Sequence, residues 1–246
     1  MSKFFVKQNQ IENNFIKVIG EDVNHITNVL RMRKNDEIQL CNQDTGENYL
    51  ATITNIFKDC VECEIKEKIE KTTESNVHIT LFQGIPKFEK MELIIQKCTE
   101  IGVKNIVPVM MERTVVKLAD KVATKKLERW QKIAEIASKQ SMRDCIPNVE
   151  NIIKIKEIDT SKFDIVLVAY ENEGHNMLKT ELNKLKITGR EYNIAIVVGP
   201  EGGISGKEIN ILKEKNAVFV SLGKRILRTE TAGLVMLGNI IYELEE

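Results

Sequence analysis

Two short loop sequences constrain this chain more than any other feature, because each directly follows an apolar run that predicts a buried strand. Residues 199–203 read GPEGG after the run Ile194–Val198, and residues 222–232 read LGKRILRTETA after a run that begins at Val218. Glycine side chains add no bulk, so the backbone of the first loop can approach a ligand closely. Loops at the carboxyl ends of neighbouring strands meet in one crevice, where open α/β sheets bind their ligands. The two loops together therefore predict one ligand site.

The spacing within the first loop excludes the common phosphate motifs. GPEGG lacks the Gly-x-Gly-x-x-Gly spacing of a dinucleotide site, and no Gly-Lys-Ser/Thr follows it as in a P-loop. The carboxylate of Glu201 favours a ligand with hydroxyl, amine or cationic groups over one bound through bare amides. A tight turn between a strand and a helix, with no ligand, would fit the same residues. A nicotinamide or nucleotide enzyme is the least favoured interpretation.

The pattern of apolar residues changes near residue 77, and this change predicts two domains. Residues 1–70 contain strand-like runs at 4–6, 15–19, 37–41, 49–56 and 61–69, with one helix at about 22–32, which is typical of a small β-barrel. The polar stretch 71–76 is expected to be a linker. In residues 77–246, runs at 77–82, 105–109, 165–169, 194–198 and 218–222 alternate with helical patterns. This alternation predicts an α/β domain with a parallel sheet.

Two local signals support the helices of the second domain. Met91, Ile94, Ile95 and Cys98 follow the spacing of a helix with one buried face, and Gly102 is placed to end that helix. After the glycine loop, residues 205–208 read SGKE, which is a capping box for a further helix.

Composition excludes several classes of protein. The 36 basic and 36 acidic residues balance, so a nucleic-acid site would have to be a local basic patch. No run approaches the roughly 20 apolar residues of a membrane span, and the first residues do not resemble a signal peptide. We therefore expect a cytoplasmic protein with reduced cysteines. Cys60 and Cys63 form a C-x-x-C without a second pair, and the three histidines are isolated, so no metal site is predicted.

The pair GPEGG and LGKRILRTETA resembles the cofactor-binding motifs of the SPOUT methyltransferases and, more narrowly, of the ribosomal RNA small subunit methyltransferase E family. Three further segments resemble that family in the same order, namely HITNVLRMRKND at 25–36, KMELIIQKCTEIGV at 90–103 and WQKIAEIASKQSMR at 130–143. The resemblance implies that residues 1–70 form a PUA-like RNA-binding domain. It also implies that residues 77–246 form a SPOUT domain with a trefoil knot, and that the chain is a homodimer.

The chemistry implied by the resemblance is transfer of a methyl group from S-adenosylmethionine to N3 of a uridine in 16S rRNA of the small ribosomal subunit. Arg228 is the expected stabiliser of negative charge on the uracil oxygens, because a guanidinium is always charged. Glu230 is the expected base for the N3 proton. A glutamate in the first turn of a helix is also favoured by the helix dipole alone, so a purely structural role for Glu230 stays open.

The same resemblance, carried over position by position, implies the residues that would hold the cofactor and the RNA. The expected cofactor residues are Ala169, Tyr170, Glu171, Val198, Gly199, Pro200, Glu201, Gly202, Gly203, Leu222, Gly223, Ile226, Leu227, Arg228 and Thr231. The expected RNA contacts are Lys3, Arg31, Arg33, Lys34, Lys87, Lys90, Gln140 and Arg143. Each of these could instead be a solvated surface residue. Family members usually carry arginine at the position of Lys3, and a lysine can neutralise a phosphate but cannot form the bidentate contact.

Two other functions remain open at this point. A SPOUT enzyme could methylate ribose 2′-oxygens of transfer RNA with the same fold and cofactor. A ribosome assembly factor without enzyme activity would bind RNA but not S-adenosylmethionine. The block containing Arg228 and Glu230, together with the PUA-like first domain, favours the uridine-N3 reaction. The intact glycine loop argues against a protein that has lost cofactor binding.

Overall fold

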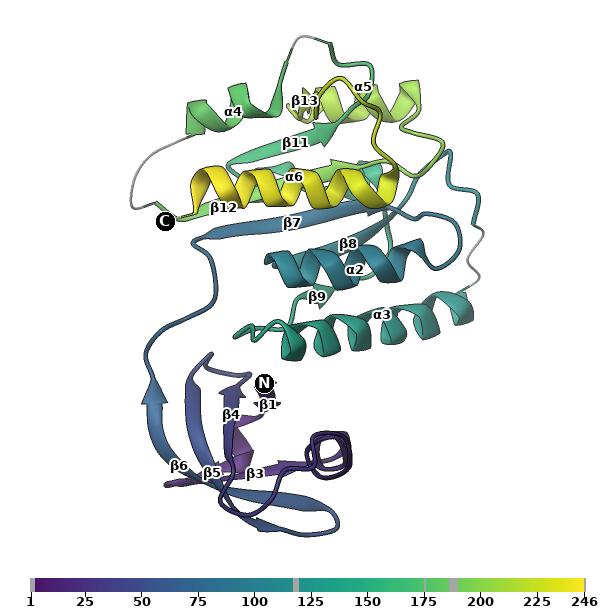
Figure 1. Ribbon diagram of the computed structural model, residues 1–246. Helices are drawn as coiled ribbons and strands as arrows, with labels where there is room; N and C mark the ends of the chain where they lie inside the picture. The colour runs from purple at the N-terminus through teal and green to yellow at the C-terminus, as the bar shows by residue number, and fades with distance from the viewer. Residues whose placement is uncertain (1–2, 117–119, 175, 186–189, 246) are drawn as a thin grey trace. The chain divides into compact units, whose positions relative to one another are not determined.

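A computed structural model describes residues 3–116, 120–174, 176–185 and 190–245 and divides the chain into two compact units (Figure 1). The first unit contains Met1–Glu74 together with Ser138–Ile146, and the second contains Ser75–Ala137 together with Pro147–Glu246. The segment Ser138–Ile146 thus belongs to the first unit, although both of its neighbours in sequence belong to the second. Sequence patterns did not indicate this return.

The first unit is built on a six-stranded sheet in which β1 and β4 are parallel and the other neighbours are antiparallel. Alternate residues of β3 face the core, since Ile16 and Val18 are buried whereas Phe15 and Ile19 are exposed. The expected strands are all present, and β2 is additional. The order across the sheet is β1 (Lys3–Val6), β4 (Glu37–Asn42), β5 (Asn48–Ile56), β6 (Cys60–Ile69), β3 (Phe15–Ile19) and β2 (Ile11–Glu12).

The helix expected at about 22–32 is shorter and irregular. The α-helix α1 (Glu21–Asn24) passes into a π-helical turn (His25–Val29), where the amide of Leu30 donates to the carbonyl of His25 at 2.9 Å. The hydroxyl of Thr27 donates to the carbonyl of Val23 at 2.8 Å. This side-chain bond competes with the backbone bond that an α-helix would make, which accounts for the wider turn.

Two ion pairs in the interior hold the returning segment in the first unit. Lys3 pairs with Asp144, and Arg143 pairs with Glu74. The carboxylate of Asp144 also accepts hydrogen bonds from the Thr72 hydroxyl at 2.8 Å and the Thr73 amide at 2.7 Å. Burial disfavours the charged form of Asp144, but these donors and Lys3 outweigh it, and the pKa of Asp144 lies below its usual value.

The second unit is an α/β fold on a sheet whose strand pairs are all parallel, which confirms the sequence prediction. Its strands occur in the order β10 (Ile153–Lys154), β8 (Asn105–Met110), β7 (Val77–Gly84), β12 (Tyr192–Val198), β11 (Ile165–Ala169) and β13 (Val218–Val220), with β9 (Asn148–Val149) paired to β8. All five expected strands are present, whereas β9 and β10 were not expected.

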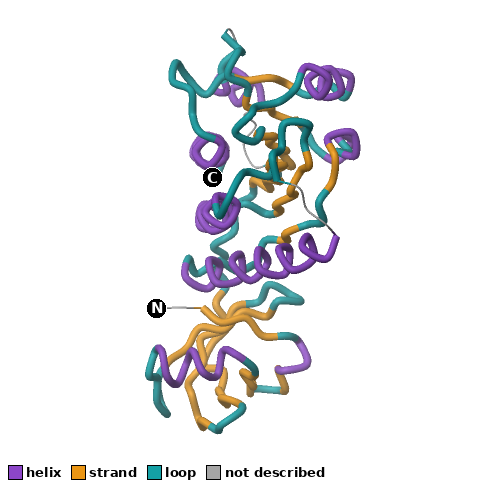
Figure 2. Tube along the Cα trace, turned by 90° about the vertical axis from the view of Figure 1, so that its right-hand side faces the viewer, coloured by secondary structure: helices purple, strands orange, loops and turns teal. Residues whose placement is uncertain are grey.

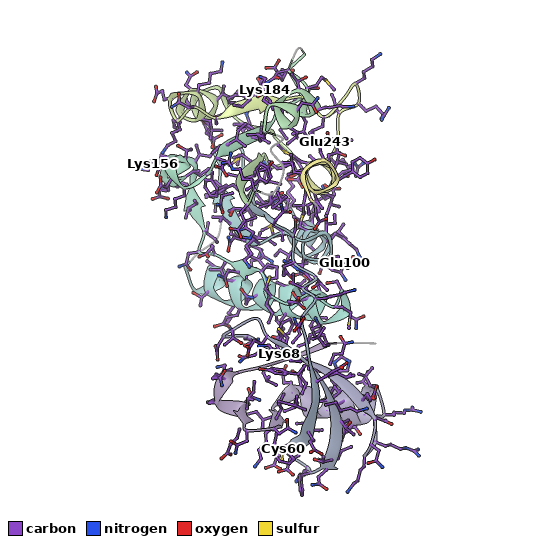
Figure 3. The ribbon with its side chains drawn as sticks, turned by 90° about the vertical axis from the view of Figure 1, so that its left-hand side faces the viewer. Cys60, Lys68, Glu100, Lys156, Lys184 and Glu243 are labelled. Atoms are coloured by element: carbon purple, nitrogen blue, oxygen red, sulfur yellow. The ribbon has the colours of Figure 1, made fainter. Side chains whose placement is uncertain are left out.

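Helices lie on both sides of these strands (Figure 2). On one side, α2 (Lys90–Ile101) packs beside α6 (Thr229–Leu244), and α6 also contacts β7 and β12. Figure 3 labels Glu100 and Glu243, near the carboxyl ends of these two helices. The other helices are α3 (Asp120–Gln140), α4 (Leu178–Leu185) and α5 (Gly206–Glu214). Among the helices of the described residues, none combines the length and apolar composition that a membrane span requires.

Both predicted helix signals are confirmed. Gly102 follows α2 in the left-handed conformation, with φ of 119°, as expected for a residue that ends a helix. Ser205 and Glu208 form the predicted capping box at the start of α5. The helix α5 therefore begins directly after the glycine loop, and its cap fixes where that loop ends.

We predict that Asp144→Asn strongly destabilises the protein, because it leaves the buried ammonium of Lys3 without a counter-charge. Breaking a buried pair in this way typically costs about 3–5 kcal/mol. Glu37→Gln, which removes the partner of Lys66 in a pair that is about half exposed, should cost far less. Urea unfolding at neutral pH measures both losses.

The loss of stability in Asp144→Asn should depend on pH. Because the folded pKa of Asp144 is depressed, its contribution is present above the usual aspartate pKa and is lost as the pH falls below it. The difference in free energy of unfolding between the wild type and Asp144→Asn should therefore become smaller in acid. A difference that does not change with pH would contradict the assignment.

Candidate functional site

A hollow of about 520 Å³ lies in the second unit, where β11, β12 and β13 end. Since these strands are parallel, the loops that follow them meet at one edge of the sheet. Ala169 ends β11 and residues 170–171 follow it, the glycine loop 199–203 follows β12, and the loop 221–228 leads from β13 into α6. The two sequence motifs that predict a ligand site thus line the same hollow.

The structure brings together all of the expected cofactor residues except Gly202 and Thr231, which do not line the hollow. Gly202 packs against another loop, where a Cβ atom would lie 2.9 Å from Cβ of Arg113. Several further residues line the hollow that sequence reasoning did not assign to it, namely Lys90, Ile204, Ser221, Lys224, Arg225, Thr229 and Ala232. Most of these are sequence neighbours of the motif residues, and that adjacency could have indicated them.

The glycine loop is held by close contacts that glycine alone allows. A Cβ atom on Gly84, the last residue of β7, would lie 2.6 Å from both Cδ and the backbone nitrogen of Pro200. Gly203 has a φ of 71°, and its amide donates to the carbonyl of Pro200 at 2.8 Å to close the turn. Arg113 donates to the carbonyl of Gly202 at 2.9 Å. The loop is therefore fixed from both sides.

A buried hydrogen-bond network connects three segments beneath the hollow. Nε2 of Gln83 donates to Oγ1 of Thr229 at 2.9 Å, and that hydroxyl donates to the carbonyl of Gly199 at 2.7 Å. Gln83 is fully buried, and Thr229 is nearly so. The network ties the end of β7 to the start of α6 and to the glycine loop. Sequence reasoning missed Gln83, although a polar residue inside an apolar strand was an available signal.

Lys90, in the first turn of α2, lies between two carboxylates of the site. Its Nζ atom is 3.0 Å from Oε1 of Glu201 and 3.2 Å from Oε2 of Glu230. The backbone amide of Lys87 also donates to Glu201, at 3.2 Å. The close carboxylate of Glu201, followed by that of Glu230, raises the pKa of Lys90. The ammonium therefore joins the glycine loop to the first turn of α6.

The two carboxylates and the nearby arginine differ in exposure. Burial disfavours ionisation of Glu201, but hydrogen bonds from its own backbone amide and from Lys90 outweigh burial and lower its pKa. The side chain of Glu230 is only 15% exposed, whereas that of Arg228 is 82% exposed, and the closest approach of their charged groups is 4.0 Å. The guanidinium of Arg228 lines the hollow and can reach an incoming molecule, whereas Glu230 does not line the hollow and is connected to it through Lys90, which does.

The expected RNA contacts fall into two groups. Arg31, Arg33, Lys34 and Gln140 are exposed, and Lys87 and Lys90 are partly exposed. By contrast, Lys3 and Arg143 are each only 4% exposed and are paired with Asp144 and Glu74 inside the first unit. The expectation that these two residues face RNA is therefore corrected to a structural role, because their charges are already neutralised in the interior.

Comparisons with known proteins place these features in context. Residues 73–241 match a family model described as "RNA methyltransferase domain", and residues 18–66 match one described as "RNA methyltransferase PUA domain". The second match confirms the PUA-like first domain. The chain is 37% identical to ribosomal RNA small subunit methyltransferase E of Bacillus subtilis, over 100% of this chain and 98% of that protein.

Two further relatives agree with this result. The protein of the same description from Mesomycoplasma hyopneumoniae is 32% identical, over 99% of this chain and 100% of its own length. Among solved structures, the fold resembles that of a ribosomal RNA small subunit methyltransferase E from Neisseria gonorrhoeae bound to S-adenosyl methionine. The TM-score is 0.84 and the identity 31%, over 100% of this chain and 98% of that one.

We predict that Lys90→Met raises the pKa of Glu201, because the variant loses a cation that favours the charged carboxylate. Carboxyl-carbon NMR titration of Glu201 measures the change. Lys97→Met removes an exposed pair with Glu100 on the same helix and should leave Glu201 unaffected. An unchanged pKa of Glu201 in Lys90→Met would show that the bridge does not persist in solution.

Proposed function

The chain belongs to the ribosomal RNA small subunit methyltransferase E family, and we propose that it transfers a methyl group from S-adenosylmethionine to N3 of a uridine in 16S rRNA. The observation that carries the proposal is the hollow in which GPEGG and LGKRILRTETA meet, lined by Arg228 and by Lys90, which pairs with Glu230. Labelled cofactor and small ribosomal subunits that lack the native methylation test it. A 3-methyluridine product would support the proposal, and a 2′-O-methyl product would overturn it.

The hollow suits S-adenosylmethionine in size and in the groups it offers. A volume of about 520 Å³ is ordinary for a site that takes a small cofactor. Within the described residues, the backbone amides of Lys224, Arg225 and Ile226 have no hydrogen-bond partner, so they can read the edge of an adenine. Ile226, with 84% of its surface exposed at the hollow, offers apolar contact to a ring face. The bound cofactor would supply an electrophilic methyl group on a sulfonium.

The remaining chemistry falls to the side chains of Glu230 and Arg228. N3 of uracil carries a proton at neutral pH and cannot accept a methyl group until that proton leaves. We assign the proton to the carboxylate of Glu230, which is little exposed and pairs with Lys90, a residue that lines the hollow. As the proton leaves, negative charge spreads over the two ring oxygens, where the guanidinium of Arg228 can stabilise it. Arg228 cannot itself act as the base, because it stays protonated.

N3 lies on the Watson–Crick edge of uracil, so the target uridine must be unpaired or turned out of a helix to reach the hollow. Phosphates beside it would need cations at the opening. Lys224 and Arg225 are exposed there, and they lie in the same loop as Arg228. We add these two residues to the proposed RNA contacts Arg31, Arg33, Lys34, Lys87, Lys90 and Gln140.

We further propose a trefoil knot, a homodimer and a cytoplasmic location. The knot is supported by the family to which the chain belongs, and the path from β13 at the sheet edge to α6 over the central strands β7 and β12 is compatible with it. The dimer is supported by exposed apolar side chains on the paired helices α2 and α6, since Leu93 is 44% and Tyr242 88% exposed. Light scattering of the protein in solution tests the dimer.

Glu230→Gln should reduce the single-turnover rate of methyl transfer by about 10²–10⁴-fold, because the amide cannot accept the N3 proton. Affinity for S-adenosylmethionine, measured by calorimetry, should stay nearly unchanged. Glu245→Gln, just beyond α6 and exposed, serves as the control. A wild-type rate in Glu230→Gln would remove this residue from the mechanism.

The double variant Lys224→Gln/Arg225→Gln should bind small subunits more weakly while retaining its rate at saturation. Each lost phosphate contact should lower the slope of log affinity against log salt by about one. Lys207→Gln, on the exposed part of α5, is the matched control. An unchanged salt slope in the double variant would show that this loop does not contact phosphate.

A further inference from the structure

Phe88 is an exposed aromatic residue in an unfavourable backbone conformation. It lies in the loop between β7 and α2, its φ is 56°, and 86% of its surface is exposed. Bulky residues rarely adopt positive φ, whereas glycine does so without strain. The side chain gains little from burial at this exposure. The fold itself therefore provides no stabilising reason for phenylalanine at this position.

The residues on either side of Phe88 are fixed to the proposed active site. The amide of Lys87 donates to both carboxylate oxygens of Glu201, at 3.2 and 3.3 Å. The ammonium of Lys90 pairs with Glu201 and Glu230. The loop that carries Phe88 is therefore held near the edge of the hollow by residues on both sides, and the ring itself faces solvent. Strained residues that the surroundings hold in place concentrate at functional sites.

We propose that Phe88 stacks on an unpaired nucleobase of the RNA substrate next to the target uridine. This inference rests on the proposed function and names a contact that selects its substrate. A target base that is turned out of a helix leaves its neighbours unstacked, and aromatic side chains are the usual partners of such bases. An exposed ring accepts any base, because every base presents a flat face. The cationic side chain of Lys87 beside the ring suits the adjoining phosphates.

If Phe88 serves RNA binding and not the fold, its replacement should affect substrate binding and stability differently. Four variants test this. Phe88→Leu keeps an apolar side chain without a ring, and Phe88→Tyr keeps the ring. Phe88→Gly removes the side chain and relieves the backbone strain. Phe57→Leu changes a half-exposed phenylalanine of the first unit and serves as the matched control.

Methyl transfer to small subunits should show a loss of kcat/KM of about 5- to 150-fold in Phe88→Leu and Phe88→Gly, the range expected for one stacked base. The loss should fall on KM, while affinity for S-adenosylmethionine is retained. Phe88→Tyr and Phe57→Leu should stay close to wild type. Phe88→Gly should also raise the melting temperature by a few degrees, so that substrate binding and stability change in opposite directions.

The outcomes distinguish failure of this inference from failure of the proposed function. If the wild type transfers no methyl group to any RNA, the proposed function fails. If the wild type is active and Phe88→Leu has the same KM, stacking is overturned. If Phe88→Leu instead changes the oligomeric state seen by light scattering while KM is unaltered, the ring contacts a second copy of the chain rather than RNA, and the proposal is likewise overturned.

Discussion

The hydroxyl group of Thr229 is the contact on which the geometry of the site depends. It accepts a hydrogen bond from Gln83 and donates one to the carbonyl of Gly199, so it fixes the start of α6 against both β7 and the glycine loop. Arg228 and Glu230 are its neighbours in sequence, so this fixed point also sets where their side chains begin. Removing the hydroxyl would leave the buried amide of Gln83 with only its bond to the carbonyl of Gly84, and would release the carbonyl of Gly199 from α6. The buried network therefore sets where the chemistry can occur.

The ion pairs of Lys90 also fix the glycine loop relative to the start of α6, as the buried network of Gln83 and Thr229 does. Two carboxylates that approach one another destabilise their charged forms, and an ammonium between them removes that penalty. Lys90 therefore permits Glu201 and Glu230 to share one edge of the hollow. Its position in the first turn of α2 also links the proposed chemistry to the loop that carries Phe88. A change in this loop would consequently alter the positions of the two carboxylates, although the loop lies far from them in sequence.

The sequence predicted the local elements well because their signals are local. The strands of the second unit, the capping box at Ser205 and the helix end at Gly102 all depend on residues within a few positions of one another. The features that were not predicted depend on partners distant in sequence. Lys3 is buried because Asp144 meets it, a separation of 141 residues, and nothing near Lys3 indicates that partner. The place of Gln83 beneath the hollow depends likewise on Thr229, 146 residues away.

The groups proposed to bind the cofactor are held rigidly, whereas those proposed to bind RNA are exposed side chains. The wall proposed for the cofactor includes the glycine loop, which packs so closely on β7 that a Cβ atom on Gly84 would lie 2.6 Å from Pro200. Such a wall is preorganised and loses little entropy on binding. The groups proposed for RNA are exposed side chains, including Lys224, Arg225 and Phe88, which can adjust to a large and irregular surface. Cofactor affinity and RNA affinity should therefore respond to different residues, even though both ligands are proposed to meet at one hollow.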